Sequence, residues 1–233
     1  MKNSITPHKS AVLNGFMIFM LSVCTYTLKA DESLLPPQQV IQEIADTLQE
    51  RLKQEDIKND TAKAREFVLT VVEPHLDFNR FSAYVLGKHW RTANRDQKKR
   101  FKKEFKTLLV RTYTTAFTEY ANSEIRFLPL DLKPEEKKII VKTEVLQSGS
   151  APVAISYRMI SKNGTWKVYD VIIEGISLVT NYRSSIRNEI ARTGSLDIVI
   201  QNLAERNNKA ANAGPATAQV DTVGAEDSAN DGS

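Results

Sequence analysis

The sequence predicts an α+β fold in which helices pack on a curved antiparallel sheet. From Pro37 to Gly87, apolar residues recur every three or four positions, which is the period of amphipathic helices. After Glu124 the period falls to two, and the residues become β-branched and aromatic, as in strands. A helical period returns after Gly175. Helices, then strands, then helices indicate an α+β domain, and a sheet covered in this way can enclose a deep apolar cleft.

The segment before residue 90 carries apolar stripes for several helices. The first stripe consists of Val40, Ile44, Leu48 and Leu52. A second helix is expected over Thr61–Val72, because Pro74 disfavours helical angles in the residue before it. A third, short helix is expected to begin after Asp77, whose side chain can cap it, and to end at Gly87.

The longest helix is expected over Asn94–Tyr120. Its apolar and aromatic face carries Phe101, Phe105, Leu108, Leu109, Tyr113, Ala116 and Phe117. Its other face carries Lys98, Lys99, Lys102, Lys103 and Lys106. We interpret the basic run from Arg95 to Arg111 as a solvated helix face rather than a nucleic-acid patch, with a weak contact to anionic lipid or a partner as its functional version.

Four strands of an antiparallel meander are expected near residues 123–128, 138–147, 152–161 and 165–173. The turn Asn163-Gly164 separates the last two strands, and two registers fit it. A two-residue turn places Asp170 beside Tyr157, whereas a three-residue turn that includes Lys162 places Tyr169 there. We favour the three-residue turn, because it keeps the carboxylate off the more apolar face. This register aligns Ile155, Tyr157 and Met159 with Tyr169, Val171 and Ile173.

Two helices are expected after the sheet. The first contains Leu178, Val179, Tyr182, Ile186 and Ile190 and ends at Gly194. The second contains Leu196, Ile198, Val199, Ile200 and Leu203. The folded domain is therefore expected to span residues 31–207.

The two ends of the chain differ in composition from this domain. Residues 1–30 combine a basic start with an apolar run too short to span a bilayer, which predicts a secretory signal cleaved after Ala30. Two alternatives stay open: an uncleaved membrane anchor, and a lipoprotein acylated on its single cysteine, Cys24. Residues 208–233 have too few apolar side chains to form a core and predict a disordered acidic tail.

Few residues suit catalysis or metal binding. Outside the signal, the histidines are His75 and His89, which lack both cysteine neighbours and helical metal-site spacing. The sequence has no Gly-rich phosphate loop and no Gly-x-Ser-x-Gly nucleophile motif. His75, Asp77 and Ser82 are close in sequence, but Asp77 is explained as a helix cap. We therefore expect no enzyme, no metal and no cofactor, and the net charge of only +4 argues against a nucleic-acid partner.

Two stretches of the sequence resemble the MlaC family, also called the toluene-tolerance family. The first matches a Gly-x-x-Trp, Gln-x-x-x-Phe-x-x-x-Phe and Leu-Leu-x-x-x-Tyr pattern through Gly87, Trp90, Gln97, Phe101, Phe105, Leu108, Leu109 and Tyr113. The second runs from Trp166 to Arg183 as Trp-Lys-Val-Tyr-Asp-Val-Ile-Ile-Glu-Gly-Ile-Ser-Leu-Val-Thr-Asn-Tyr-Arg. Ile173 and Ile176 stand where the family pattern has valine. The resemblance covers Pro37 to Leu203.

The resemblance implies a fold related to the NTF2-like shape, with an apolar cavity between the sheet and the helices. It further implies a soluble, non-enzymatic periplasmic carrier that holds phospholipid tails in this cavity and moves lipid between the outer and inner membranes, which maintains outer-membrane lipid asymmetry. The implied partners are an outer-membrane lipoprotein-porin complex and an inner-membrane ABC transporter complex. The carrier is expected to be a monomer.

The expected cavity residues come from the long helix and from one face of the sheet. The wall candidates are Leu108, Tyr113, Phe117, Val141, Val145, Tyr157, Met159, Tyr169, Val171 and Ile173, and the entrance candidates are Leu178 and Tyr182. Two alternative functions stay open. A small cavity enzyme on the same fold needs a buried acid or base, such as Asp170, that faces the cavity. An envelope adaptor would bind the helix of a partner protein in the same groove.

Overall fold

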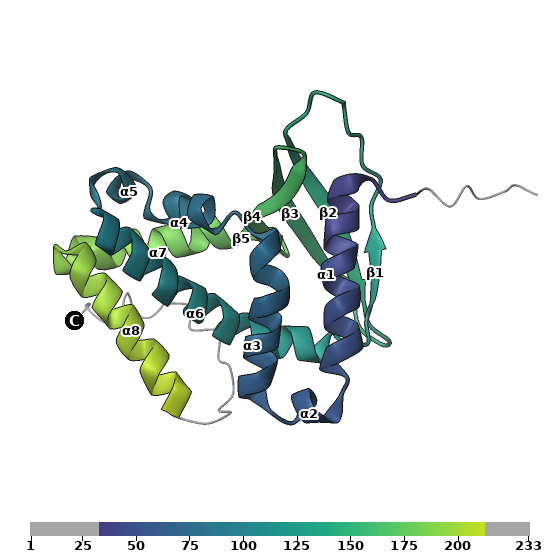
Figure 1. The fold of residues 1–233 in the computed structure, drawn as a ribbon, viewed down its shortest axis with the longest axis horizontal. Coiled ribbons are helices and arrows are strands. Elements are labelled where there is room, and N and C mark those ends of the chain that lie inside the picture. Colours follow the sequence, from purple (N-terminus) through teal and green to yellow (C-terminus); the bar gives the residue numbers. More distant parts are fainter. Residues whose placement is uncertain (1–32, 213–233) are drawn as a thin grey trace, which may run out of the picture. The chain divides into compact units, whose positions relative to one another are not determined.

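A computed structural model describes residues 33–212 of the chain (Figure 1). The expected signal, Cys24 included, and the part of the expected tail beyond Asn212 lie outside the described residues. The described chain from Leu34 onward belongs to one compact unit. None of its described helices combines the length and the apolar character that crossing a membrane requires.

A five-stranded antiparallel sheet forms one layer, with its strands in sequence order. The strands are β1 Glu124–Phe127, β2 Lys138–Leu146, β3 Val153–Lys162, β4 Thr165–Ile173 and β5 Ile176–Ser177. The expected meander is confirmed, and β5 is an addition to it. Glu174 and Gly175 join β4 to β5 with φ angles of 48° and 81°, so the chain reverses within two residues and Ile173 pairs with Ile176.

The turn between β3 and β4 is shorter than expected. Asn163-Gly164 forms a two-residue turn that places Lys162 opposite Thr165. Both turn residues have positive φ, 52° and 79°, as a type I′ turn requires. The expected three-residue turn is therefore wrong, because Asn-Gly satisfies the tighter turn without help from Lys162.

The pairing of β3 with β4 then shifts by one residue. The observed pairs are Met159 with Val168, Arg158 with Asp170, and Tyr157 with Val171. Tyr169 is the extra residue of a β-bulge, so the expected pairing of Tyr157 with Tyr169 is also wrong. The bulge nevertheless keeps Asp170 away from Tyr157, which is the result that the longer turn was expected to give.

Helix α1 (Pro36–Leu52) covers the apolar face of the sheet. Ile41 of α1 is buried together with Val141, Met159, Trp166 and Val168 from the strands, and we call this group the sheet cluster. Each such side chain contributes about 1.5–3 kcal/mol when it leaves water. Figure 1 shows α1 and α3 side by side next to the sheet.

Two short helical segments and α3 connect α1 to the rest of the domain. These elements are α2 Glu55–Lys58, α3 Thr61–Val72 and the 3-10 helix Glu73–His75. The expected bounds of α3 are confirmed, because Asp60 accepts hydrogen bonds from the N–H groups of Ala62 and Lys63 at its start, and Pro74 follows its end. The α3 cluster buries Leu48, Leu52, Ile57, Ala64, Val68 and Ala121.

Five further helices form a second group at the end of the sheet that carries β4 and β5. They are α4 Phe78–Leu86, α5 Lys88–Thr92, α6 Arg95–Glu119, α7 Leu178–Thr193 and α8 Leu196–Asn212. The helix cluster in their centre contains Phe81, Val85, Leu86, Phe101, Phe105, Leu178, Val179, Ile186, Ile190, Val199, Ile200 and Leu203. Figure 1 shows α6 running between α4 and α8.

Local signals set the ends of these helices as the sequence predicts. Asp77 caps α4, Asn94 and Gln97 form a capping box on α6, and Gly194 ends α7 in a left-handed conformation. Helix α8 continues to Asn212, past the expected start of the tail at residue 208. The Asn207 side chain helps to hold it, because Nδ2 donates to the Glu104 carbonyl oxygen of α6 at 2.9 Å.

Candidate functional site

Most of the cavity candidates fall in two of the three apolar clusters. In the sheet cluster, Val141 and Met159 are fully buried and Tyr157 packs against them. The candidates in or against the helix cluster are Leu108, Tyr113, Ile173, Leu178 and Tyr182. Val171 packs against both clusters. The sheet and helix clusters therefore contain candidates from α6, α7, β2, β3 and β4, and Val171 is the candidate at which the two clusters meet.

Many of these candidates are only half-buried. The half-buried ones are Leu108, Tyr113, Tyr157, Val171, Ile173 and Tyr182. They differ in this respect from Val141 and Met159, which have no exposed surface. Partly exposed apolar side chains gathered around one strand form a surface that a ligand or a partner can cover.

Three candidates lie apart from the others. Phe117 packs against the α3 cluster. Val145 is buried near the end of β2, opposite Val153 of β3. Tyr169 occupies the bulge, and its ring meets the edge of the Tyr84 ring of α4 at a centroid distance of 5.7 Å. The sequence assigns Tyr169 to the row of Tyr157, and the bulge removes it from that row.

Tyrosine hydroxyls supply the polar groups of this surface. Tyr113 of α6 and Tyr182 of α7 are hydrogen-bonded to each other, and burial raises the pKa of both. Burial also raises the pKa of Tyr157, which a hydrogen bond to Thr143 partly opposes. These hydroxyls are therefore neutral at physiological pH. The surface can form a few hydrogen bonds but offers no charge of its own, which suits an apolar ligand.

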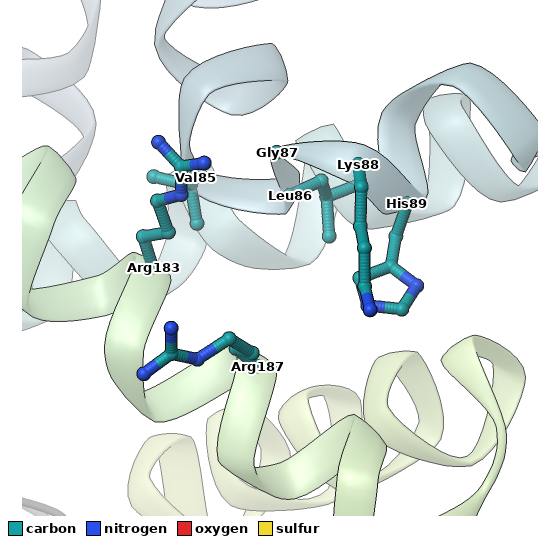
Figure 2. A pocket seen from close by; sticks show the side chains of 7 residues that line it. All are labelled: Val85, Leu86, Gly87, Lys88, His89, Arg183 and Arg187. Atoms are coloured by element: carbon teal, nitrogen blue, oxygen red, sulfur yellow. The ribbon is translucent and has the colours of Figure 1, made fainter.

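Two pockets formed by described residues lie away from this surface. One, of about 260 Å³, lies between the α4–α5 turn and α7 (Figure 2). The other, of about 290 Å³, is lined by residues of α1, α2 and α3. No cavity candidate lines either pocket. Neither pocket is therefore the expected apolar cavity. Most of the candidate side chains pack in the sheet and helix clusters instead.

Comparison with known proteins identifies the family. The family model described as MlaC protein matches residues 38–205, which is most of the described domain. The chain belongs to the MlaC family. The resemblance carried by the motifs around Trp90 and Trp166 is thereby confirmed.

Individual members of the MlaC family are similar to most of the chain. The intermembrane phospholipid transport system binding protein MlaC of Haemophilus influenzae is 28% identical over 173 residues, which cover 72% of this chain and 77% of that protein. Toluene tolerance protein ttg2D of Pseudomonas putida is 26% identical over 189 residues, covering 80% and 86%.

A solved structure of similar fold is the phospholipid-binding protein of Ralstonia solanacearum in complex with a phospholipid. It matches with a TM-score of 0.71 and 27% identity, over 76% of this chain and 99% of that chain. This match confirms the expected α+β fold with helices on an antiparallel sheet. The finer relation to the NTF2-like shape stays a prediction.

Asp170, the carboxylate considered as an acid or base, has structural partners. It is 1% exposed and accepts hydrogen bonds from Arg158 Nη1 at 3.1 Å, Ser177 Oγ at 2.7 Å and the Val179 N–H at 3.0 Å. Ser177 in turn caps α7 by accepting from the N–H of Thr180. A carboxylate held by several donors fixes the position of the elements that carry them. Asp170 therefore joins β3, β4 and the first turn of α7.

The residues His75, Asp77 and Ser82 do not form a catalytic arrangement. Both Asp77 oxygens accept from Arg80, one from its N–H at 3.0 Å and the other from Nε at 3.2 Å. Ser82 is fully buried, and its hydroxyl has no hydrogen-bond partner within residues 33–212. A serine nucleophile needs both access to substrate and a base. Within the same residues, no cluster of three or more His, Cys, Asp or Glu side chains could hold a metal ion.

The two family motifs meet in space, which the sequence does not show. An added Cβ at Gly87 would lie 3.1 Å from Nε of Arg183, so the arginine of the second motif rests on the glycine of the first. Arg187 lines the same pocket, one helical turn further along α7. Neither arginine is recognisable as a site residue from the sequence, because about a hundred positions separate them from Gly87. In contrast, Lys106 of the expected lysine face is paired with Glu73.

Proposed function

We propose that this protein binds phospholipid through its acyl chains and carries it between the outer and inner membranes, which maintains outer-membrane lipid asymmetry. The observation that carries the proposal is the set of half-buried apolar side chains in the sheet and helix clusters, which meet at Val171. The bound phospholipid of the Ralstonia solanacearum structure, and the name of the Haemophilus influenzae relative, support the choice of ligand.

The energetics of acyl-chain burial suit a carrier. Each buried methylene contributes about 0.8 kcal/mol, so two acyl chains represent on the order of 20 kcal/mol against water. A membrane offers nearly the same free energy. A protein surface that matches the bilayer can therefore exchange lipid with little net cost, and recognition through the tails tolerates several phospholipid classes.

The proposed setting follows from the ends of the chain and from the family. Residues 1–30 act as the export signal, residues 31–212 as the lipid-binding domain, since α8 continues to Asn212, and residues 213–233 as an acidic tail. The carrier works as a periplasmic monomer without catalytic activity. Its partners are an outer-membrane lipoprotein-porin complex and an inner-membrane ABC transporter complex. The hydrogen bonds of Asp170 support the non-enzymatic role, because they occupy the one carboxylate proposed for catalysis.

Extraction of the natively purified protein tests the ligand. We expect organic solvent to release phospholipid in an amount comparable to that of the protein, as measured by mass spectrometry and by phosphorus content. Protein that is unfolded, stripped of lipid and refolded serves as the control and should release none. Recovery of no phospholipid from the native preparation would overturn the proposed function.

A transfer assay tests the carrier role separately from binding. Donor vesicles that contain a fluorescent, quenched phospholipid are mixed with unlabelled acceptor vesicles. We expect the rate of transfer to rise in proportion to the concentration of added protein, because a soluble carrier shields the acyl chains from water between the two membranes. A protein that retains lipid after purification but leaves this rate unchanged would be a lipid-binding adaptor rather than a carrier.

A further inference from the structure

The pocket between the α4–α5 turn and α7 is rich in positive charge. We call it the basic pocket; its lining residues are Val85, Leu86, Gly87, Lys88, His89, Arg183 and Arg187. No acidic side chain is among these lining residues. Figure 2 shows the two arginines on α7, and Lys88 and His89 on the other side of the pocket. The α4–α5 turn and α7, which are distant in sequence, thus both contribute cationic side chains to the lining of this pocket.

The arginines of the basic pocket are among the described arginines that have no carboxylate partner, as are Arg65, Arg91, Arg95, Arg111 and Arg192. Salt bridges hold Arg51, Arg80, Arg100, Arg126, Arg158 and Arg206. Within the described part of the chain, Arg183 and Arg187 form no salt bridge and no side-chain hydrogen bond. Like charges four residues apart on a helix repel each other. A bound anion would relieve this repulsion.

The backbone at Gly87 positions one of these cations. Gly87 has φ 55° and ψ −121°, a conformation that suits glycine, and its missing side chain leaves room for the Arg183 guanidinium. Any Cβ there would lie 3.1 Å from both Nε and Nη2. Val85 and Leu86 line the pocket beside the cations and are 1% and 2% exposed. Lys88, Arg183 and Arg187 themselves are exposed, so salt screens their attraction for an anion and low ionic strength favours binding.

We propose that the basic pocket binds a phosphate group. Guanidinium groups hold phosphate oxygens through paired hydrogen bonds, and a lysine adds a point charge. The volume of about 260 Å³ lies just below the range of about 300–1,000 Å³ typical of pockets for whole small molecules. It suits a phosphate with a small substituent and excludes acyl chains. The phosphate can belong to a lipid head group, in which case the inference rests on the proposed function, or to free phosphate.

Calorimetric titration with inorganic phosphate tests the pocket in the full exported chain. We expect saturable binding at low ionic strength that an equal ionic strength of sodium chloride does not reproduce. Arg187→Gln should weaken this binding at least tenfold, because it removes one of the paired donors. The matched control is Arg192→Gln, which removes another exposed arginine from the same helix but outside the pocket, and should change the affinity less than twofold. Circular dichroism checks that both variants fold.

Absence of saturable binding to the wild-type protein, or an equal loss in the two variants, would overturn the inference. The source of the phosphate is read from lipid extraction of the same variants. A lower phospholipid content in Arg187→Gln than in Arg192→Gln identifies the lipid head group, whereas equal contents identify free phosphate. Both results keep the phosphate site. A wild-type protein that carries no lipid would contradict the proposed function but leave the phosphate titration unaffected. The proposed function and the phosphate site can therefore fail separately.

Discussion

At the scale of single residues, Asp170 receives hydrogen bonds from three directions and lies almost wholly out of water. Asp170→Asn keeps the shape but replaces one acceptor with an amide donor. We expect the free energy of unfolding to fall by about 2–3 kcal/mol, as is usual when a buried charged acceptor loses its bonds. The larger losses seen for fully buried ion pairs do not apply, because the Arg158 side chain is 41% exposed. Urea denaturation measures the change.

Asp197→Asn is the matched control for this prediction. Asp197 also accepts from side chains, Gln97 and Arg100, but it is half-exposed. Water replaces such bonds readily, so the urea midpoint should stay close to that of the wild-type protein. If the two variants lost equal stability, the network around Asp170 would have no special role. The sequence places Asp170 off the apolar face correctly, but its donors come from Arg158 and α7, which only the folded pairing brings near.

At the scale of elements, the hydroxyl pair of Tyr113 and Tyr182 links α6 to α7, and burial raises the pKa of both. A pKa raised by folding means that the folded state favours the neutral hydroxyl. The resulting stability is present below the unfolded pKa of about 10 and is lost as the pH rises above it. We expect the free energy of unfolding to fall between about pH 10 and about pH 11, and less steeply in the Tyr113→Phe/Tyr182→Phe double variant. Urea titrations across this range measure both slopes.

The same double variant at neutral pH is the reference for this comparison, because both hydroxyls are then neutral. It measures the cost of losing the hydrogen bond, about 1 kcal/mol, apart from any titration. Lysine deprotonation contributes to the alkaline slope of both proteins and cancels in the difference between them. Equal slopes for the wild type and the variant would show that the tyrosines do not titrate differently on unfolding.

The ends of elements are predictable from sequence where a local group sets them. Asp60 and Asn94 cap their helices through the backbone within three residues, and Pro74 stops the helix before it. The sequence does not predict the short elements α2, α5 and β5, because two to five residues are too few to show a hydrophobic periodicity. The bulge at Tyr169 is not predictable from the alternation of apolar residues, because this alternation assumes one constant register along a strand.

At the scale of the whole molecule, residues 33–212 form three apolar clusters rather than one continuous core. The sequence predicts which side chains are apolar and which element carries each. It does not separate a cavity wall from a core, because both use the same residue types. Leu108 is half-buried while Phe105, on the same helix face, is fully buried. Their difference arises from which strands and helices lie opposite, and that is set by contacts distant in sequence.

Enlarging the residue that both clusters share tests where acyl chains bind. Val171→Trp adds a large ring on the apolar face, next to Tyr157. We expect lipid affinity to fall roughly tenfold, which corresponds to a loss of about 1.4 kcal/mol in binding free energy. Excluding fewer than two acyl-chain methylenes from the protein is enough to cause this loss. Overpacking costs about 1–3 kcal/mol, so a urea titration must show that the variant still folds. Phospholipid content after native purification, and titration with lipid, measure the effect.

Ile140→Trp supplies the control from the opposite face of the sheet. Ile140 is 41% exposed and lies opposite Arg158, away from the row of Tyr157. The same ring is therefore added to the same sheet, but into water rather than toward the helices. We expect its lipid content to match that of the wild-type protein. Wild-type affinity in a folded Val171→Trp variant would place the acyl chains elsewhere, whereas a loss confined to Val171→Trp would locate them between the sheet and the helix cluster.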